Sequence, residues 1–355
     1  MREVGIVAYA QSPQVRQERE LNEVEILMPM LDQALAEAHM EMSDIDFVCS
    51  GSCDYIAGGA FSFVGAVDAL GATPCKMESH VEMDAAWALY ESWMKIQTGE
   101  IKTALIYGFG KSSVGSLPDV LSQQLDPYYL APLWLDSISL AGLQANSLLQ
   151  SGRYSEADFA EVVVQSRKKA MSNSNAQLSG EVSAAELLKQ PYIASPLRKH
   201  DCCPITDGAS VLIIGEKSSL PNNGKRPVYI RGIDHRMEVH QLGLRDLPNS
   251  SSTTQSLANA AKQAGFDSND VDFAELYTAF SPQTLILKDA LALPEKVDVN
   301  PSGGPLAGHI MMSAGLDRFG MAYRAINDGK GDRAIAHATS GPCLQHNLVS
   351  LVEGG

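Results

Sequence analysis

The sequence predicts an α/β fold built from two similar halves. Short apolar runs alternate with segments of helical periodicity, a pattern typical of strands joined by helices into a largely parallel sheet. The same order begins again after the polar stretch 216–227, and a chain of 355 residues is too long for one small core. We therefore predict an N-terminal half over residues 1–222 and a C-terminal half over residues 223–355.

The first half is expected to open with strands and helices in alternation. Apolar runs that end in turn residues predict strands at 4–10, 44–51, 75–81 and 102–110. Apolar residues at helical spacing predict helices at 23–40, 61–70 and 83–98. Gly71 and Gly99 follow two of these helices, a common place for a C-terminal glycine. Pro29 is expected to bend the first helix or to mark its first turn.

Residues 112–160 interrupt this rhythm and are rich in Tyr, Trp, Leu and Pro. We expect a partly helical excursion, which could wall a ligand pocket, make a dimer contact or simply pack against the rest of the chain. The first half then closes with two helices and a strand, expected at 158–172, 183–191 and 208–216.

The second half repeats strands and helices after the linker. Its strands are expected at 228–234, 270–277, 332–341 and 345–354. Its helices are expected at 252–266, 282–293 and 318–329, the first with Ser and Thr available as N-caps. The repeated order suggests an internal duplication.

Composition and charge exclude several classes of function. The hydrophobic fraction of 45% and charged fraction of 19% describe an ordinary globular protein. A net charge of −15 argues against nucleic acid as a partner, although local basic residues can still hold an anionic ligand. The N-terminal stretch lacks the pattern of a signal peptide, and no apolar run approaches the ~20 residues of a membrane span. A cytoplasmic location is expected.

The cysteines fit neither a zinc site nor a disulfide scaffold, because their spacing supplies no second pair of ligands. We expect no metal site. The six positions are Cys49, Cys53, Cys75, Cys202, Cys203 and Cys343.

Four stretches in order resemble the thiolase superfamily. They are "AWALYESWMKIQTGEIKTALIYGFGK" (86–111), "PITDGASVLIIGE" (204–216), "DFAELYTAFSPQTLI" (272–286) and "NPSGGPLAGHIMMSAG" (300–315). Within the superfamily the chain looks closest to the lipid-transfer-protein-type thiolases of steroid side-chain degradation, some of which are retro-aldolases.

The resemblance implies a fold, a substrate class and partners. The fold would be two thiolase-like βαβαβαββ halves in a layered α-β-α-β-α sandwich with an inserted loop domain. The substrate would be an acyl-coenzyme A, with coenzyme A as part of the substrate and no covalently bound cofactor. Members usually form homodimers or heterodimers, and some resemble subunits that bind a small OB-fold protein with a zinc ribbon.

The nucleophile of the family is missing. Counting back from "GFGK" places Glu82 at the nucleophile position, flanked by His80 and Asp84. A carboxylate cannot replace a polarisable thiolate in acyl transfer. The two acidic residues could simply stabilise a helix N-terminus, or they could line the former nucleophile pocket together with His80.

Two proton-handling residues remain at family positions. Tyr277 falls where the family has Asn or His, and His309 falls on its Gly-His segment. They are the predicted catalytic pair, with the acid and the base not assigned. The alternatives are a core tyrosine and a structural histidine. Because retro-aldol cleavage of a 3-hydroxyacyl-coenzyme A needs an acid, a base and oxyanion donors but no nucleophile, it fits this inventory.

Further residues are predicted to line the substrate site. Glycine-rich turns can direct backbone N–H groups at a thioester, and the basic stretch 195–204 could meet phosphates, although a solvated loop is favoured there. His337 lies near the position of the family's second cysteine, and Cys343 lies several residues beyond it, where buried packing is favoured. The predicted substrate-binding set is His80, Glu82, Asp84, Ser302, Gly303, Gly304, His337, Gly341 and Cys343.

Three functions follow from this reading. The first is a retro-aldolase that releases a steroid-like ketone or aldehyde and a short acyl-coenzyme A. The second is a non-catalytic acyl-coenzyme A-binding or scaffold subunit of a hetero-complex, which the missing nucleophile suggests directly. The third, least favoured, is an acyltransferase with non-standard residues.

Overall fold

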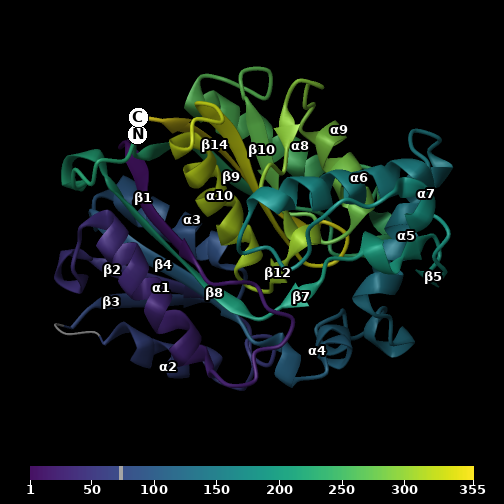
Figure 1. Ribbon diagram of the computed structural model, residues 1–355, viewed down its shortest axis with the longest axis horizontal. Coiled ribbons are helices and arrows are strands. Elements are labelled where there is room, and N and C mark those ends of the chain that lie inside the picture. The colour runs from purple at the N-terminus through teal and green to yellow at the C-terminus, as the bar shows by residue number, and fades with distance from the viewer. Residues whose placement is uncertain (72–74) are drawn as a thin grey trace.

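Ten strands form one mixed sheet across the middle of the molecule (Figure 1). The computed structural model describes residues 1–71 and 75–355. Residues before the linker supply β1 (Val4–Gln11), β2 (Phe47–Gly51), β3 (Met77–Val81), β4 (Thr103–Gly110) and β8 (Gly208–Glu216). Residues after it supply β9 (Val228–Met237), β10 (Phe273–Leu276), β11 (Asp298–Val299), β13 (Arg333–Ser340) and β14 (His346–Gly354).

The two halves of the sheet have the same strand order and pairing. From the centre outward, the first half runs β1-β8-β4-β2-β3 and the second runs β9-β14-β13-β10-β11. In each half the two outer pairs are parallel and the two inner pairs are antiparallel. An antiparallel pairing of β1 with β9 joins the halves into one sheet. The duplicated fold is thus visible in the topology, while the boundary at residue 222 stays a prediction.

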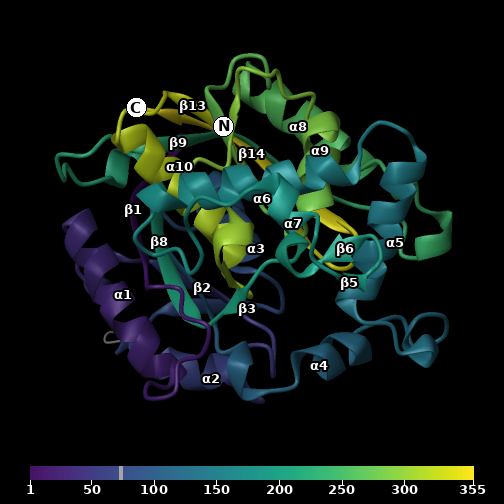
Figure 2. The ribbon, with the colours of Figure 1, turned by 45° about the vertical axis from the view of Figure 1, so that its right-hand side comes forward.

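Helices cover both faces of the sheet and fill the space between its halves (Figures 1 and 2). The central helices α3 (Ala85–Thr98) and α10 (Ala314–Asn327) contact each other. Helix α3 packs on the first half of the sheet, and α10 packs on the second half and on β1 and β8. On the outer faces, α1 (Glu23–Ala38) covers β1 and β8, and α8 (Ser251–Ala264) covers β9 and β14. This arrangement confirms the predicted layering of helix and sheet. The short helices α2 (Ser62–Val67) and α9 (Ser281–Ala290) precede β3 and β11.

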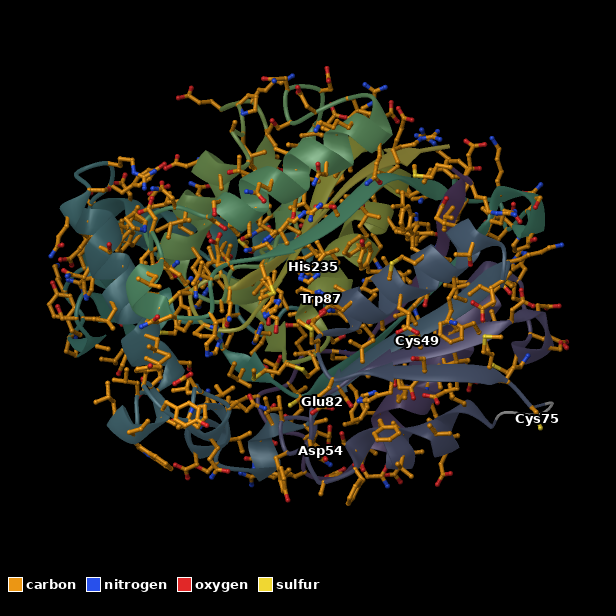
Figure 3. All side chains as sticks on the ribbon, turned by 180° about the vertical axis from the view of Figure 1, so that it is seen from behind. Cys49, Asp54, Cys75, Glu82, Trp87 and His235 are labelled. Atoms are coloured by element: carbon orange, nitrogen blue, oxygen red, sulfur yellow. The ribbon has the colours of Figure 1, made fainter. Side chains whose placement is uncertain are left out.

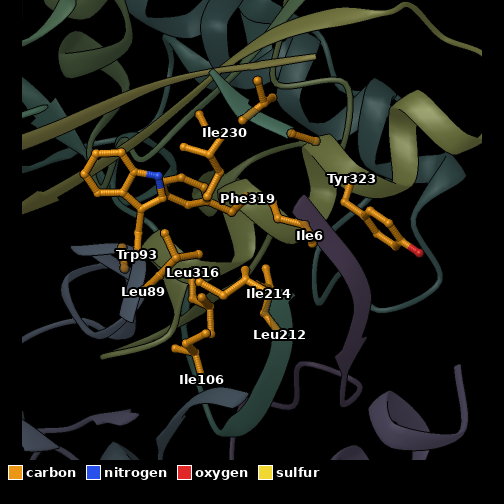
Figure 4. Close-up of a cluster of buried hydrophobic side chains, with 14 of the residues drawn as sticks. Ile6, Leu89, Trp93, Ile106, Leu212, Ile214, Ile230, Leu316, Phe319 and Tyr323 are labelled. Atoms are coloured by element: carbon orange, nitrogen blue, oxygen red, sulfur yellow. The ribbon is translucent and has the colours of Figure 1, made fainter. Parts of the chain in front are cut away.

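The central core lies between the two inner helices and the sheet. Figure 4 shows Leu89 and Trp93 of α3 beside Leu316 and Phe319 of α10, over Ile106 of β4. Successive side chains of a strand face opposite sides of the sheet, and β4 is buried at every position, which is why it is mostly apolar. A Cβ on Gly320 would lie 2.2 Å from the ring of Tyr9, so only glycine lets α10 approach β1 so closely.

The excursion after β4 is longer than the predicted 112–160 and extends to β8. Its elements are α4 (Leu117–Gln123), α5 (Ser137–Gln150), α6 (Glu156–Lys169), α7 (Ala184–Leu187), β5 (Tyr192–Ala194), β6 (Leu197–Arg198) and β7 (Ile205–Thr206). Strand β7 pairs with β12 (His309–Ile310), which ties the excursion to the second half. Among the described residues, no helix combines the length and apolar composition needed to cross a membrane.

Other predicted elements are close to the observed ones, with informative exceptions. Pro29 lies inside α1 rather than in its first turn. The helix predicted at 183–191 shrinks to the single turn of α7. Helix α10 begins at Ala314, four residues before the predicted 318, because its first N–H groups find an acceptor on another helix.

That acceptor is the carboxylate of Asp84. It caps α3 by accepting from the N–H of Ala86 at 2.8 Å, and it also accepts from Gly315 at 2.8 Å and Leu316 at 3.1 Å in the first turn of α10. One side chain therefore satisfies orphan N–H groups of both central helices. Burial raises the pKa of Asp84 to about 6, although the three N–H groups partly offset that effect.

The raised pKa of Asp84 predicts a stability that falls as pH rises. The folded protein keeps the proton up to about pH 6, whereas the unfolded chain loses it near 3.8. Unfolding free energy should therefore drop by roughly 3 kcal/mol between about pH 4 and pH 6 and then level off. Chemical denaturation of the wild type and Asp84→Asn across this range measures the difference. A difference that does not change with pH would show that Asp84 does not titrate in this window.

Candidate active site

Tyr277 and His309 meet at the carboxyl end of β10. Tyr277 Oη lies 2.6 Å from His309 Nε2 in a hydrogen bond, and the ring centroids are 5.2 Å apart. The two residues are 6% and 2% exposed. The structure thus brings together the two residues that the sequence selected as a pair, although they lie 32 positions apart.

Local geometry explains this meeting. Strand β10 pairs in parallel with β13. The N–H of Tyr277 donates to the carbonyl of His337 at 3.2 Å, which holds Tyr277 just beyond the carboxyl end of β10. His309 belongs to β12, which pairs with β7 of the excursion. A Cβ on the preceding Gly308 would lie 1.6 Å from Oε1 of Gln14, so a larger residue there would displace the end of that side chain.

Burial leaves both members of the pair uncharged at neutral pH. Burial raises the pKa of Tyr277 well above its usual value, and the negative charge of Asp84 adds to this effect. Burial lowers the pKa of His309 to about 3, helped by the positive charge of Arg318. The hydroxyl therefore keeps its proton, and one ring nitrogen of the imidazole is unprotonated.

His80 and Glu82 lie at a different place from this pair. His80 stacks on Phe63 with a centroid distance of 4.5 Å, and its Nε2 donates to Glu82 at 3.2 Å. The Glu82 side chain is 60% exposed and accepts from the N–H of Asp54. Figure 3 shows Glu82 beside Asp54, apart from Trp87 at the start of the central helix. Glu82 therefore does not fill a buried pocket, which the sequence left open as an alternative; the buried acid at the start of α3 is Asp84.

The glycine-rich turn 301–304 is occupied by internal contacts. The N–H of Ser302 donates to Glu275 at 3.0 Å, the N–H of Gly303 to Asn300 at 2.9 Å, and that of Gly304 to Ser302 at 3.2 Å. The expectation that these donors face a ligand is therefore wrong. Of the three, only the N–H of Ser302 donates to the buried ion pair of Glu275 and Arg318, whose N–O distance is 2.6 Å.

The predicted site residues near the C-terminus, His337, Gly341 and Cys343, also make contacts within the chain. His337 is fully buried on β13, and its Nε2 lies 3.0 Å from Asn347. Gly341 takes a positive φ of 75° in the turn to β14, where a Cβ would meet Gln345 at 2.7 Å. Cys343 is buried and its thiol donates to the carbonyl of Leu140 at 3.4 Å. Burial raises its pKa to about 11, which fits the packing role favoured from the sequence.

A large cavity opens beside the pair. Its volume is about 740 Å³, and the four consecutive residues 202–205 form part of its wall. Ile205 of that wall belongs to β7, which pairs with His309 on β12 (Figure 1). The N–H of Cys203 also donates to the carbonyl of Ala279, two residues after Tyr277. The cavity is therefore one strand away from the catalytic candidates, and neither of them is among its lining residues.

The lining of the cavity is basic. Arg16, Arg167 and Lys199 contribute to it together with His200, and no carboxylate of the described residues does. Arg167 is half-buried on α6 and its Nε has no hydrogen-bond partner in the described chain. A desolvated guanidinium without a counter-ion is suited to hold an anion.

Sequence reasoning predicted only part of this site. The preference for a solvated loop at 195–204 holds for Lys199, which is exposed, and was wrong for His200, which is buried; both residues line the cavity. The sequence did not indicate Arg16 and Arg167, because no local pattern shows that residues so far apart in the chain line the same cavity. Among the described residues, no group of three or more His, Cys, Asp or Glu side chains is arranged to hold a metal ion.

Comparison with curated proteins finds similarity to thiolases and sterol carrier proteins. It is 26% identical over 217 residues to the benzoylsuccinyl-CoA thiolase subunit BbsB of Thauera aromatica, covering 54% of this chain and 56% of that protein. It is 25% identical over 362 residues to sterol carrier protein 2 of Homo sapiens, covering 89% of this chain and 64% of that protein. The match thus spans less than two thirds of either relative. No protein-family model matches the chain.

Solved structures show the same fold over the whole chain. The Ltp2-ChsH2(DUF35) aldolase superposes with a TM-score of 0.83 at 17% identity, covering 99% of this chain and 98% of that one. A monomeric SCP2-thiolase-like protein type 1 from Mycobacterium smegmatis gives a TM-score of 0.79 at 20% identity, covering 99% and 77%. The predicted resemblance is confirmed: the chain has the thiolase fold, and its relatives in sequence are thiolase-superfamily proteins.

Proposed function

We propose that this protein is a carbon–carbon lyase that cleaves a 3-hydroxyacyl-coenzyme A by a retro-aldol reaction. The observation that carries the proposal is the 2.6 Å hydrogen bond between Tyr277 and His309, which pairs a protonated phenol with a neutral imidazole. The aldolase among the structural neighbours supports the same reaction class.

The reaction needs only proton transfers. His309 accepts the proton of the β-hydroxyl group, the oxygen forms a carbonyl, and the Cα–Cβ bond breaks. The electrons of that bond pass to the thioester as an enolate, whose oxygen accepts a hydrogen bond from Tyr277. The proton held by His309 then moves to Cα, which yields a shorter acyl-coenzyme A and a ketone or aldehyde. The developing negative charge strengthens both interactions in a buried site.

The cavity supplies the binding energy for the coenzyme A portion of the substrate. Its phosphates would contact Arg16, Arg167 and Lys199, while the apolar part of the lining accepts the pantetheine chain. A steroid-like acyl group is the substrate class implied by the resemblance in sequence. A second thiolase-fold subunit and a small OB-fold zinc-ribbon protein stay proposed partners. The second of these agrees with the two components of the Ltp2-ChsH2(DUF35) aldolase.

Acyl transfer through a cysteine has little support. The segment that leads into α3 has no cysteine, and Asp84 occupies its cap. Burial raises the pKa of the Cys203 thiol at the cavity wall and that of Cys343, so both stay protonated at neutral pH. A protonated thiol is a poor nucleophile.

The alternative function, an acyl-coenzyme A-binding scaffold, is favoured by one observation. Tyr277 and His309 are buried and do not line the cavity, so a ligand bound there does not touch them in this conformation. Activity measurements separate the two functions.

Removing either member of the pair should abolish turnover and spare binding. We expect Tyr277→Phe and His309→Ala to lower kcat by about 10²–10⁴-fold, since each loses acid–base help, with KM changed only a few-fold. The assay follows release of short-chain acyl-coenzyme A from a 3-hydroxyacyl-coenzyme A with a branched β-carbon. Tyr323→Phe is the matched control, because Tyr323 is buried and donates to the carbonyl of Val7. Absence of turnover in the wild type, with binding intact, would favour the scaffold.

Arg167 should contribute to binding rather than to chemistry. Arg167→Gln is expected to weaken coenzyme A binding by roughly 10–100-fold, as loss of a charge-assisted hydrogen bond predicts, and to leave kcat unchanged. Isothermal titration with coenzyme A measures the affinity. Lys168→Gln is the control, because the adjacent exposed residue carries the same charge and does not line the cavity. Equal losses in both variants would show that only net charge matters and would refute the contact.

A further inference from the structure

One wall of the cavity is attached to the segment that carries Tyr277. This wall segment is residues 199–205, and all of them except Asp201 line the cavity. The segment 277–281 leads from Tyr277, just beyond β10, into the start of α9. We call the two stretches the wall segment and the tyrosine segment. They are distant in the sequence, and they contact each other in the fold.

Two backbone contacts hold the segments side by side. The N–H of Cys203 donates to the carbonyl of Ala279 at 2.8 Å. Cys202 and Phe280 form an isolated antiparallel bridge. The tyrosine segment therefore runs alongside the wall segment in the opposite direction, so a displacement of one is transmitted to the other.

Asp201 adds a side-chain contact between the segments. It does not line the cavity and is 1% exposed, whereas its neighbours on both sides line the cavity. Its Oδ1 accepts from the hydroxyl of Ser281 at 2.6 Å, and its Oδ2 accepts from the N–H of Arg198 at 2.8 Å. Among the described residues, no other hydrogen bond joins a side chain of the wall segment to a side chain of the tyrosine segment.

The tyrosine segment is thus anchored at both of its ends. At one end the N–H of Tyr277 donates to the sheet, and at the other end the fully buried hydroxyl of Ser281 donates to Asp201. Between these ends, the hydroxyl of Thr278 is buried and has no hydrogen-bond partner in the part of the chain that the structure describes. The placement of Tyr277 therefore depends on the two anchors, and one of them belongs to the cavity wall.

We propose that Asp201 is a positioning residue that couples occupation of the cavity to the placement of Tyr277. A phosphate bound at Lys199 fixes the wall segment, Asp201 holds Ser281, and Ser281 fixes the far end of the tyrosine segment. A displacement of about 1 Å at a reacting group can change a rate by about 100-fold, so a small adjustment is enough. The inference rests on the proposed function, because it takes coenzyme A as the ligand of the cavity.

Hydrogen–deuterium exchange with coenzyme A tests the coupling without requiring turnover. We expect coenzyme A to slow exchange of the backbone amides in 199–205 and in 276–286 of the wild type. In Ser281→Ala, which deletes the hydrogen bond to Asp201, the effect at 199–205 and the affinity should stay the same. The effect at 276–286 should fall by at least about 5-fold, the low end of typical coupling between sites.

Ser256→Ala is the matched control for this variant. Ser256 is fully buried on α8, and its hydroxyl donates to the carbonyl of Asn347 at 3.2 Å, so the substitution also removes a buried hydroxyl and one hydrogen bond. We expect it to leave both exchange responses as in the wild type. Thermal unfolding with and without coenzyme A checks that each variant folds and binds.

Steady-state kinetics gives a second readout, which a merely structural role would not reproduce. Ser281→Ala should lower kcat by about 10-fold with KM nearly unchanged, because coenzyme A still binds while Tyr277 is less well placed. Slowed exchange confined to 199–205 in the wild type, or an equal loss of coupling in Ser256→Ala, would overturn the inference and leave the lyase standing. Coupled slowing in a protein without turnover would support the inference and contradict the lyase.

Discussion

The contact between α3 and α10 is the interaction on which the rest of the fold depends. These helices carry the apolar side chains that fill the space between the halves of the sheet, and their N-termini share the carboxylate of Asp84. The buried carboxylate of Asp84 fixes where both helices begin, so it also fixes the position of the N-terminus of α3 relative to that of α10. The cost of burying the carboxylate is offset by three backbone donors, which is why this acid is tolerated at the centre of the molecule.

The buried charges near Tyr277 and His309 are also compensated by partners within the chain. The ion pair of Glu275 and Arg318 is almost completely buried, and Ser302 donates to it from both its N–H and its hydroxyl group. The positive charge of Arg318 in turn disfavours protonation of His309. The glycine-rich turn 301–304, which resembles a ligand-binding segment, therefore contacts the ion pair of Glu275 and Arg318. It supports Tyr277 and His309 through that ion pair.

The excursion separates the two tasks of the site. Its inner segment, from Lys199 to Ile205, contributes to a basic cavity, and β7 connects that wall to the strand of His309. Under the proposed function, chemistry at Tyr277 and His309 would stay dry, because the anionic part of the substrate would bind in the cavity and not at the pair. Such a division suits a reaction that forms an enolate, since buried donors act more strongly on developing charge than hydrated ones.

The sequence by itself determined the order of elements, the duplicated α/β fold and the choice of Tyr277 and His309, because apolar periodicity and short ordered motifs are local properties of the chain. It misplaced Glu82, which is exposed, and the turn at Ser302, whose donors point inward. It also missed Arg16 and Arg167. Only the tertiary structure decided these points, because burial and the partner of each polar group depend on which distant segments pack together. A pattern along the chain identifies residues that can do chemistry, and the packing of the two halves decides which of them are free to do it.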